Sequence, residues 1–213
     1  MKQPVWDLPV RLVHWLLAAL IAFSWWSVHN HHTDWHIWSG CAILTLLIFR
    51  ILWGFFGSST ARFSSFVRGP RTIAAYMRGS WVGIGHNPLG ALSVLALFAA
   101  VAVQVGLGLI SEDEDGLYFG PLATLVSTDT SDSARDIHEL WFKVILGLIA
   151  LHLLAILIYR LGGKKLTVPM ITGWARLEPG SAPMRKGKWW VALICLAVGI
   201  GITRWIIAGA PPF

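Results

Sequence analysis

The chain of 213 residues is strongly apolar: hydrophobic residues make up 55% and charged residues 13%, with a mean hydropathy of +0.63. This composition excludes an ordinary soluble domain and is typical of a protein that crosses a membrane several times. The net charge of +6 comes from basic blocks between the apolar segments. It therefore gives no support to a nucleic-acid partner.

Five apolar segments are each long enough to cross a hydrocarbon core about 30 Å thick. They are residues 10–28, 37–56, 89–110, 138–161 and 189–208. We therefore predict an all-α membrane protein with five transmembrane helices.

The basic residues predict the orientation of these helices, because lysine and arginine accumulate in cytoplasmic loops. They lie before the first segment, between the second and third, and between the fourth and fifth. The connection between the third and fourth segments holds one arginine, Arg135, against an acidic run that begins at Glu112. We expect a multi-pass membrane protein with its N-terminus inside, in the cytoplasm, and its C-terminus outside.

The first two segments each carry a histidine. His14 lies about one turn inside the membrane on the cytoplasmic side, and His36 opens the second segment near the outer face. Gly40 follows His36 by one turn and leaves room on the same helix face for a bulky planar ligand. Arg50, near the inner end of the second segment, is expected to extend toward the membrane surface.

His86 precedes the third segment, and we expect it to be a capping or surface residue, with a role near a quinone as the alternative. The segment contains Gln104, the one strongly polar side chain in its middle. Gly106 and Gly108 follow toward its outer end. These glycines allow a neighbouring helix or a cofactor to approach closely, although simple helix packing is an alternative interpretation.

The fourth segment carries two histidines, His138 and His152, fourteen residues apart. Fourteen residues are close to four helical turns, so both imidazoles point in nearly the same direction, about 21 Å apart along the axis. One helix face therefore carries a histidine at each end. The fifth segment contains no histidine, and we predict that it packs against the other helices or faces a partner.

The predicted orientation sorts the four histidines into two pairs at matching depths: His36 with His138 near the outer face, and His14 with His152 toward the inner side. Ionisable side chains within a bilayer are costly and are functional candidates. Two imidazoles on facing helices suit axial ligation of a haem iron. Four unrelated buried histidines are the alternative, but they would need a coincidence of depth in both pairs.

Several segments resemble the bacterial cytochrome b561 and nickel-iron hydrogenase b-type cytochrome family. They are VWDLPVRLVHW, HIWSG with FRILWGF, GHNPLGALSVLALF, EDEDG with GPLATLVS, and HELWFKVILGLIALHLL. The resemblance covers residues 4 to about 160 and implies a four-helix bundle that holds two b haems. It also implies the bacterial inner membrane, so that the outer C-terminus is expected to be periplasmic. It implies the same pairing of His36 with His138 and of His14 with His152.

On this basis residues 1–161 are predicted to form a four-helix dihaem cytochrome b domain. Residues 162–188 are predicted as a basic cytoplasmic loop, and residues 189–213 as the fifth transmembrane helix with a C-terminal tail. The expected function is electron transfer between the quinone pool and a periplasmic c-type cytochrome or hydrogenase-like enzyme. An electron-transfer subunit is favoured over a stand-alone enzyme, with membrane lipid around the chain and homodimer formation left open.

Cationic side chains at suitable depths are candidates for binding haem propionates: Arg11 on the inner side, and Arg135 or Lys143 on the outer side. Arg50 and His86 are candidates for the side that meets a bound quinone.

Two alternative functions remain open from the sequence. The family resemblance allows a stand-alone superoxide:quinone oxidoreductase. The histidines of the short outer loop, His29, His31 and His32, together with His36, allow a metal transporter or sensor.

Overall fold

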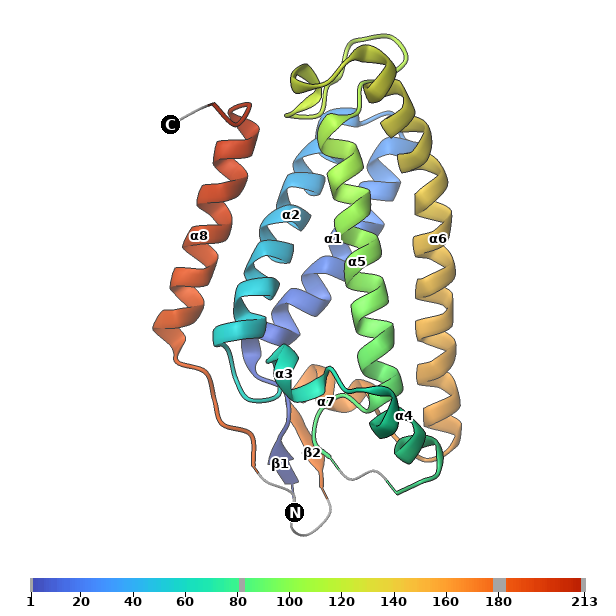
Figure 1. The fold of residues 1–213 in the computed structure, drawn as a ribbon, viewed down its shortest axis with the longest axis vertical. Helices are drawn as coiled ribbons and strands as arrows, with labels where there is room; N and C mark the ends of the chain where they lie inside the picture. The colour runs from blue at the N-terminus through green and yellow to red at the C-terminus, as the bar shows by residue number, and fades with distance from the viewer. Residues whose placement is uncertain (1, 81–82, 178–182, 212–213) are drawn as a thin grey trace. The chain divides into compact units, whose positions relative to one another are not determined.

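The computed structural model describes residues 2–80, 83–177 and 183–211. In chain order the elements are β1 (Lys2–Pro4), α1 (Leu8–His29), α2 (Thr33–Phe56), α3 (Phe63–Phe66), α4 (Pro70–Met77), α5 (Pro88–Ile110), the 3-10 helix η1 (Ala123–Leu125), α6 (Thr128–Leu161), α7 (Thr167–Thr172), β2 (Trp174–Arg176) and α8 (Trp189–Ile207) (Figure 1). Within these described residues, five helices are long and apolar enough to span a membrane: α1, α2, α5, α6 and α8. The prediction of an all-α protein with five candidate transmembrane helices is confirmed.

Helix α6 begins at Thr128, well before the apolar segment predicted to start at residue 138. The additional turns are polar, and hydropathy does not detect them. The Ser127 hydroxyl accepts a hydrogen bond from the backbone N–H of Thr130 (3.3 Å), as expected of a residue that caps a helix. Asp129 in the first turn complements the helix dipole.

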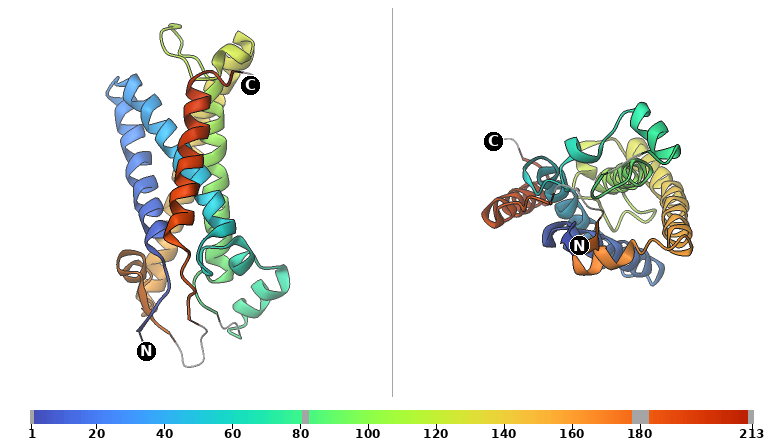
Figure 2. Two further views of the ribbon diagram at one scale, coloured as in Figure 1. Left: turned by 90° about the vertical axis from the view of Figure 1, so that its left-hand side faces the viewer. Right: turned by 90° about the horizontal axis from the view of Figure 1, so that it is seen from below.

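The chain divides into two compact units. The first unit comprises Met1–His14, Arg50–Leu97 and Leu148–Cys195. The second unit comprises Trp15–Phe49, Phe98–Gly147 and Leu196–Phe213. All five long helices contribute residues to both units. The short helices α3, α4 and α7 and both strands belong to the first unit. Figure 2 shows the same ribbon from two further sides.

The N-terminus of the first unit is tied to the segment after α7. Strands β1 and β2 pair antiparallel, with Gln3 opposite Ala175. The backbone N–H groups of Val5 and Trp6 both donate to the carbonyl of Gly173, which has a φ of +85°. That left-handed backbone conformation favours glycine. The predicted loop 162–188 is therefore fastened to the start of the chain, although residues 178–182 lie outside the described part.

Among the described residues of the first unit, Trp53 is the largest fully buried side chain, with 1% of its surface exposed. Its indole Nε1 donates to Oδ2 of Asp7 (2.9 Å), while Oδ1 of Asp7 accepts from the backbone N–H of Val10 (2.8 Å). A Cβ at Gly187 would lie 2.6 Å from the Trp53 ring. The indole thus fits against position 187 because glycine has no side chain there. Asp7 caps α1 with one carboxylate oxygen and accepts the indole N–H with the other.

In the second unit, the segment after α5 folds back onto the end of that helix. The N–H groups of Gly120 and Leu122 donate to the carbonyls of Ser111 and Leu109, both at 2.8 Å. The Ser131 hydroxyl of α6 donates to the carbonyl of Ile110 (2.8 Å). These contacts satisfy carbonyl groups that a helix C-terminus would otherwise leave without partners.

Helix α8 packs on α2 in the second unit through small residues. The Thr45 hydroxyl donates to the Thr203 hydroxyl (2.9 Å), and a Cβ at Gly199 would lie 3.0 Å from the carbonyl oxygen of Thr45. Close contact at small residues and hydrogen bonds between hydroxyls are typical of helix association in membranes.

Candidate haem-binding histidine pairs

The four predicted haem ligands are divided equally between the two units. His14 and His152 lie in the first unit, and His36 and His138 lie in the second. Helix α6 therefore supplies one histidine to each unit, while α1 and α2 supply the other members. All four side chains are partly buried.

The structure brings His36 and His138 together. The centroids of their rings are 5.9 Å apart and the ring planes meet at 81°. Bonds between a metal ion and imidazole nitrogens are about 2.0 Å long, so two imidazoles on opposite sides of one ion have centroids about 6 Å apart. The observed separation fits a pair of axial haem ligands.

The hydrogen bonds of both rings leave the same nitrogen free. Nδ1 of His36 lies 3.0 Å from the carbonyl oxygen of Ser24, and Nδ1 of His138 lies 2.9 Å from that of Gln104. A carbonyl can only accept, so Nδ1 of His138 carries the proton and its Nε2 keeps the lone pair. The Ser24 hydroxyl also lies 3.0 Å from Nδ1 of His36. With its proton on Nδ1, His36 too donates to a carbonyl and keeps the lone pair on Nε2. Ligand histidines commonly donate their second N–H to a carbonyl in this way. The donor chemistry of the pair therefore fits haem iron.

Helix α5 packs directly against His138. A Cβ at Gly108 would lie 2.9 Å from Cε1 of the imidazole, and Nε2 of Gln104 donates to the backbone carbonyl of His138 (3.0 Å). At Gly40, one turn after His36, a Cβ would meet no atom within 4 Å. The space beside Gly40 is open, as expected from the sequence. The space beside Gly108 is filled by the imidazole of His138.

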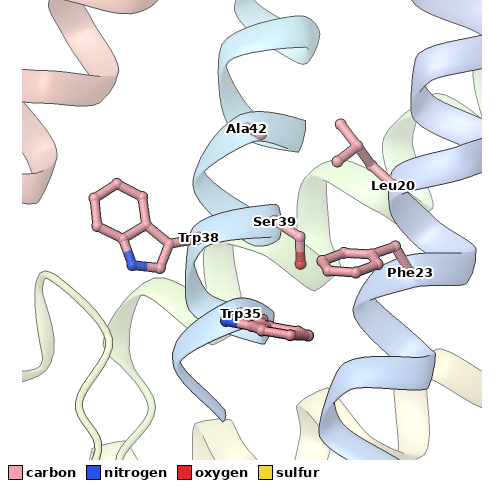
Figure 3. A pocket seen from close by; sticks show the side chains of 6 residues that line it. All are labelled: Leu20, Phe23, Trp35, Trp38, Ser39 and Ala42. Carbon is pink, nitrogen blue, oxygen red and sulfur yellow. The ribbon is translucent and has the colours of Figure 1, made fainter. Parts of the chain in front are cut away.

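A separate apolar groove of about 520 Å³ lies beside the first turns of α2. It is lined by Leu20, Phe23, Trp35, Trp38, Ser39 and Ala42. Figure 3 shows Trp38 on one side of Ser39 and Phe23 on the other. The Ser39 hydroxyl donates to the carbonyl of His36 (2.8 Å), so it is already engaged within the helix. The imidazole of His36 does not line this groove.

His14 and His152 are close enough in the first unit to interact electrostatically. His86 joins them, although its position before α5 suggested a surface or capping residue. The ring centroid of His86 lies 4.5 Å from that of Trp6 and 5.2 Å from that of Phe66. Burial, followed by the positive charge of Arg50 and then by His14 and His152, lowers the pKa of His86 to about 3. His86 is therefore neutral at physiological pH.

Arg50 is buried, with 8% of its surface exposed, so the prediction that it extends to the membrane surface is wrong. Its Nη1 donates to the carbonyl of Ala61 (3.2 Å), and its guanidinium lies 5.4 Å from the ring centroid of Phe63 and 6.0 Å from that of Phe66. The segment after α2 folds back as α3 and covers the cation. Cation–π contacts compensate part of the cost of this burial.

The three predicted propionate contacts have different surroundings. Arg11 donates to the backbone carbonyl of Ile171, while its Nε is buried without a hydrogen-bond partner among the described residues. Arg135 forms ion pairs with Asp132 (2.9 Å) and Asp136 (3.5 Å). Lys143 is exposed on α6. Their role toward haem stays a prediction.

Two histidines of the connection between α1 and α2, His29 and His32, stack on tryptophans. His29 lies 5.5 Å from Trp25, and His32 lies 4.6 Å from Trp35, measured between ring centroids. Among the described residues, no group of three or more His, Cys, Asp or Glu side chains is arranged to hold a metal ion. The loop histidines therefore give no support to a metal transporter or sensor.

Two partners of the candidate ligands were not identified as such from the sequence. Ser24 lies in α1 and holds His36 from twelve residues away. Gln104 was noted only as a polar residue, and its main-chain carbonyl holds the His138 ring. The polar side chains of Ser24 and Gln104 in apolar helices are a signal for these two positions. The main-chain carbonyls that accept the hydrogen bonds cannot be recognised from the sequence.

Comparison with known proteins identifies the family. The sequence profile described as prokaryotic cytochrome b561 matches residues 5–173, well over half of the chain. Curated proteins and solved structures give no match. The matched range contains all four candidate ligands and ends at Gly173, just before β2. The chain thus belongs to the prokaryotic cytochrome b561 family of multi-pass membrane proteins, in which b-type haem transfers electrons across the membrane.

Proposed function

We propose that this chain is a dihaem cytochrome b that carries electrons between the membrane quinone pool and a periplasmic redox partner. His36 with His138 would hold one haem, and His14 with His152 the other. The observation that supports this most strongly is the 5.9 Å separation of the His36 and His138 rings, with both Nδ1 atoms facing carbonyl acceptors.

In His36 and His138 the two imidazole nitrogens would have different tasks. The Nδ1–H group of His36 or His138 donates to a carbonyl and thereby orients the ring, while Nε2 is available to the metal. When bound, haem iron supplies one-electron oxidation and reduction. Two histidines bound to one iron would leave no position for oxygen, which would favour electron transfer over oxygen binding.

The proposed topology has the N-terminus in the cytoplasm and the C-terminus in the periplasm, following the basic loops. Residues 1–161 would form the dihaem domain, 162–188 the cytoplasmic loop and 189–213 the fifth helix with its tail. Residues 1, 81–82, 178–182 and 212–213 in these ranges lie outside the described part. Accessibility of single introduced cysteines in intact cells and in opened vesicles tests this topology.

The acidic segment after α5 suggests the kind of partner. Glu114 and Asp115 are exposed, and they would attract a protein with a basic patch around its redox centre. Superoxide is an anion, so the same charges would slow its approach. The stand-alone superoxide oxidase is therefore the less favoured alternative. Haem reduction by superoxide in the isolated protein, at a rate that rises with salt, would favour it.

On the inner side, Arg50 and His86 are proposed to face the quinone. A quinone carbonyl accepts hydrogen bonds, and a buried guanidinium offers five donors. Arg11 inside, and Arg135 or Lys143 outside, remain the proposed partners of haem propionates.

Reduced-minus-oxidised spectra with redox titration test the ligand assignment. Wild type should show two haem components. His36→Ala and His138→Ala should remove one component, and His14→Ala and His152→Ala the other. A protein that retains both components after His138→Ala would overturn the assignment. Loss of both from every variant, with intact folding by circular dichroism, would contradict two independent sites.

A further inference from the structure

Two hydrogen bonds of opposite direction join Gln104 of α5 to His138 of α6. The imidazole Nδ1–H donates to the main-chain carbonyl of Gln104 (2.9 Å). In return, the side-chain Nε2 of Gln104 donates to the main-chain carbonyl of His138 (3.0 Å). Both the ring and the backbone of His138 are thus fixed by one residue of the neighbouring helix.

Gly108, one turn after Gln104, provides the space for the ring. A Cβ at this position would lie 2.9 Å from Cε1 and 3.3 Å from Nδ1 of His138. Real Cβ atoms do not approach a ring atom so closely, so an alanine here would force the imidazole to turn or shift. At Gly106 on the same helix, a Cβ would meet nothing within 4 Å. The requirement for glycine therefore belongs to position 108.

Burying the side-chain amide of Gln104 costs free energy. Its Oε1 is buried and has no hydrogen-bond partner among the described residues. Leaving a buried polar atom without a partner is unfavourable, and more so within a bilayer. A methionine of similar length would fill the space without this cost. The contribution that distinguishes glutamine is the hydrogen bond that its Nε2 donates to His138.

We propose that Gln104 and Gly108 are positioning residues for the His138 imidazole and that they tune the redox potential of the iron this ring ligates. The inference rests on the proposed ligation by His138. A strong Nδ1–H···O bond makes the imidazole a better donor to the metal, which favours the ferric state. Loosening that bond raises the midpoint potential.

The orientation of the ring provides a second readout. The planes of His36 and His138 meet at 81°. The ferric electron paramagnetic resonance (EPR) spectrum of a bis-histidine haem depends on this angle, and packing stability alone does not determine it. A change in the plane of His138 therefore alters the spectrum even when both haems remain bound.

The experiment uses the full-length protein with both haems in detergent. Gln104→Met removes the amide donor, and Gly108→Ala displaces the ring. Gly106→Ala is the matched control for the added methyl group. Ser111→Ala is the control for a lost polar group, because its hydroxyl, just after the end of α5, donates to the carbonyl of Leu107 (2.8 Å) and not to His138. Each protein is titrated for both haem potentials, and its ferric EPR spectrum is recorded.

We expect both test variants to raise the potential of the component that His138→Ala removes. A tenfold change in the preference of the site for ferric over ferrous iron corresponds to about 59 mV. The EPR signal of the same component should change, while the other component and both controls should match wild type.

The outcomes separate the two proposals. If His138→Ala removes one component but Gln104→Met and Gly108→Ala keep wild-type potentials and spectra, the positioning role is wrong and ligation stands. If His138→Ala keeps both components, ligation itself fails.

If both test variants lose the haem that His138→Ala removes, Gln104→Glu decides, since its protonated carboxyl can still donate to the main-chain carbonyl of His138. Recovery of the haem with the wild-type spectrum supports positioning, and no recovery assigns the loss to packing and overturns it.

Discussion

The groups bonded to the rings of His36 and His138 are uncharged, whereas His14 and His152 share their unit with a buried arginine. In the second unit, Ser24 and Gln104 hold the rings by hydrogen bonds. In the first unit, Arg50 is close enough to affect the neighbouring His86 electrostatically. The two histidine pairs therefore lie in different electrostatic surroundings. We expect the redox potentials of the two proposed haems to respond to different substitutions.

The largest effect that would sharpen this comparison is expected from Trp53→Ala in the first unit. Removing a buried tryptophan costs about 3–5 kcal/mol, and here it also leaves Asp7 without its indole donor. The His14–His152 haem should dissociate at a lower temperature, while the other component is less affected. Haem absorbance during heating in detergent measures this.

Trp38→Ala is the control for that substitution, because Trp38 is 66% exposed. Its removal should cost no more than about 0.5 kcal/mol. Equal loss of both haem components in Trp53→Ala would argue against two units of separate stability.

His86 should make the stability of the first unit depend on pH. Its pKa is lowered from 6.5 to about 3. Above about pH 6.5 the ring is neutral in the folded and the unfolded chain, so it contributes no pH dependence. As the pH falls below that value, the unfolded chain binds a proton that the folded chain does not. Stability should therefore decrease, by about 2–3 kcal/mol near pH 4.5.

His86→Phe tests this effect, since a phenyl ring can keep the contacts with Trp6 and Phe66. Thermal midpoints between about pH 7 and 4.5 should fall less steeply in the variant than in wild type. Parallel curves for the two proteins would show that His86 titrates normally in the folded state.

Arg50→Gln should lower the potential of the proposed His14–His152 haem. A nearby positive charge disfavours the oxidised iron, so its removal favours oxidation. A unit charge about 10 Å away contributes about 1–2 kcal/mol at an effective dielectric constant of about 20. The His36–His138 component should change less in the same redox titration. Equal shifts of both components would mean that the two electrostatic settings are not distinct.

The smallest effect is expected from Thr203→Val, which removes the hydroxyl bond between α8 and α2. Such bonds contribute about 0.6 kcal/mol within membranes. Unfolding in detergent should become slightly easier, with both haem potentials unchanged. A shift in either potential would give the fifth helix a role beyond packing.

The number of long helices and the positions of the histidines could be predicted, because apolar length and ionisable residues within a span are local signals. The neighbours of the histidines could not. The carbonyls that hold His36 and His138 belong to the main chain, which has the same groups at nearly every position. Only the fold determines which carbonyl meets which ring.

Arg50 illustrates a second limit of the sequence. An arginine near the end of an apolar segment normally extends to the membrane surface. In this chain the loop that follows returns as α3 and brings Phe63 and Phe66 over the guanidinium. Strands β1 and β2 were also missed, since three residues are too few to show the alternation of a strand.

The ribbon of β1 and β2 has a consequence for biosynthesis. Lys2 is made before α1, yet its partner Arg176 is made only after α6. The N-terminal strand must therefore wait, without its partner, through the insertion of α1, α2, α5 and α6. A nascent chain that ends before residue 174 should leave its first residues open to protease, which makes closure of the ribbon a marker for completion of the first unit.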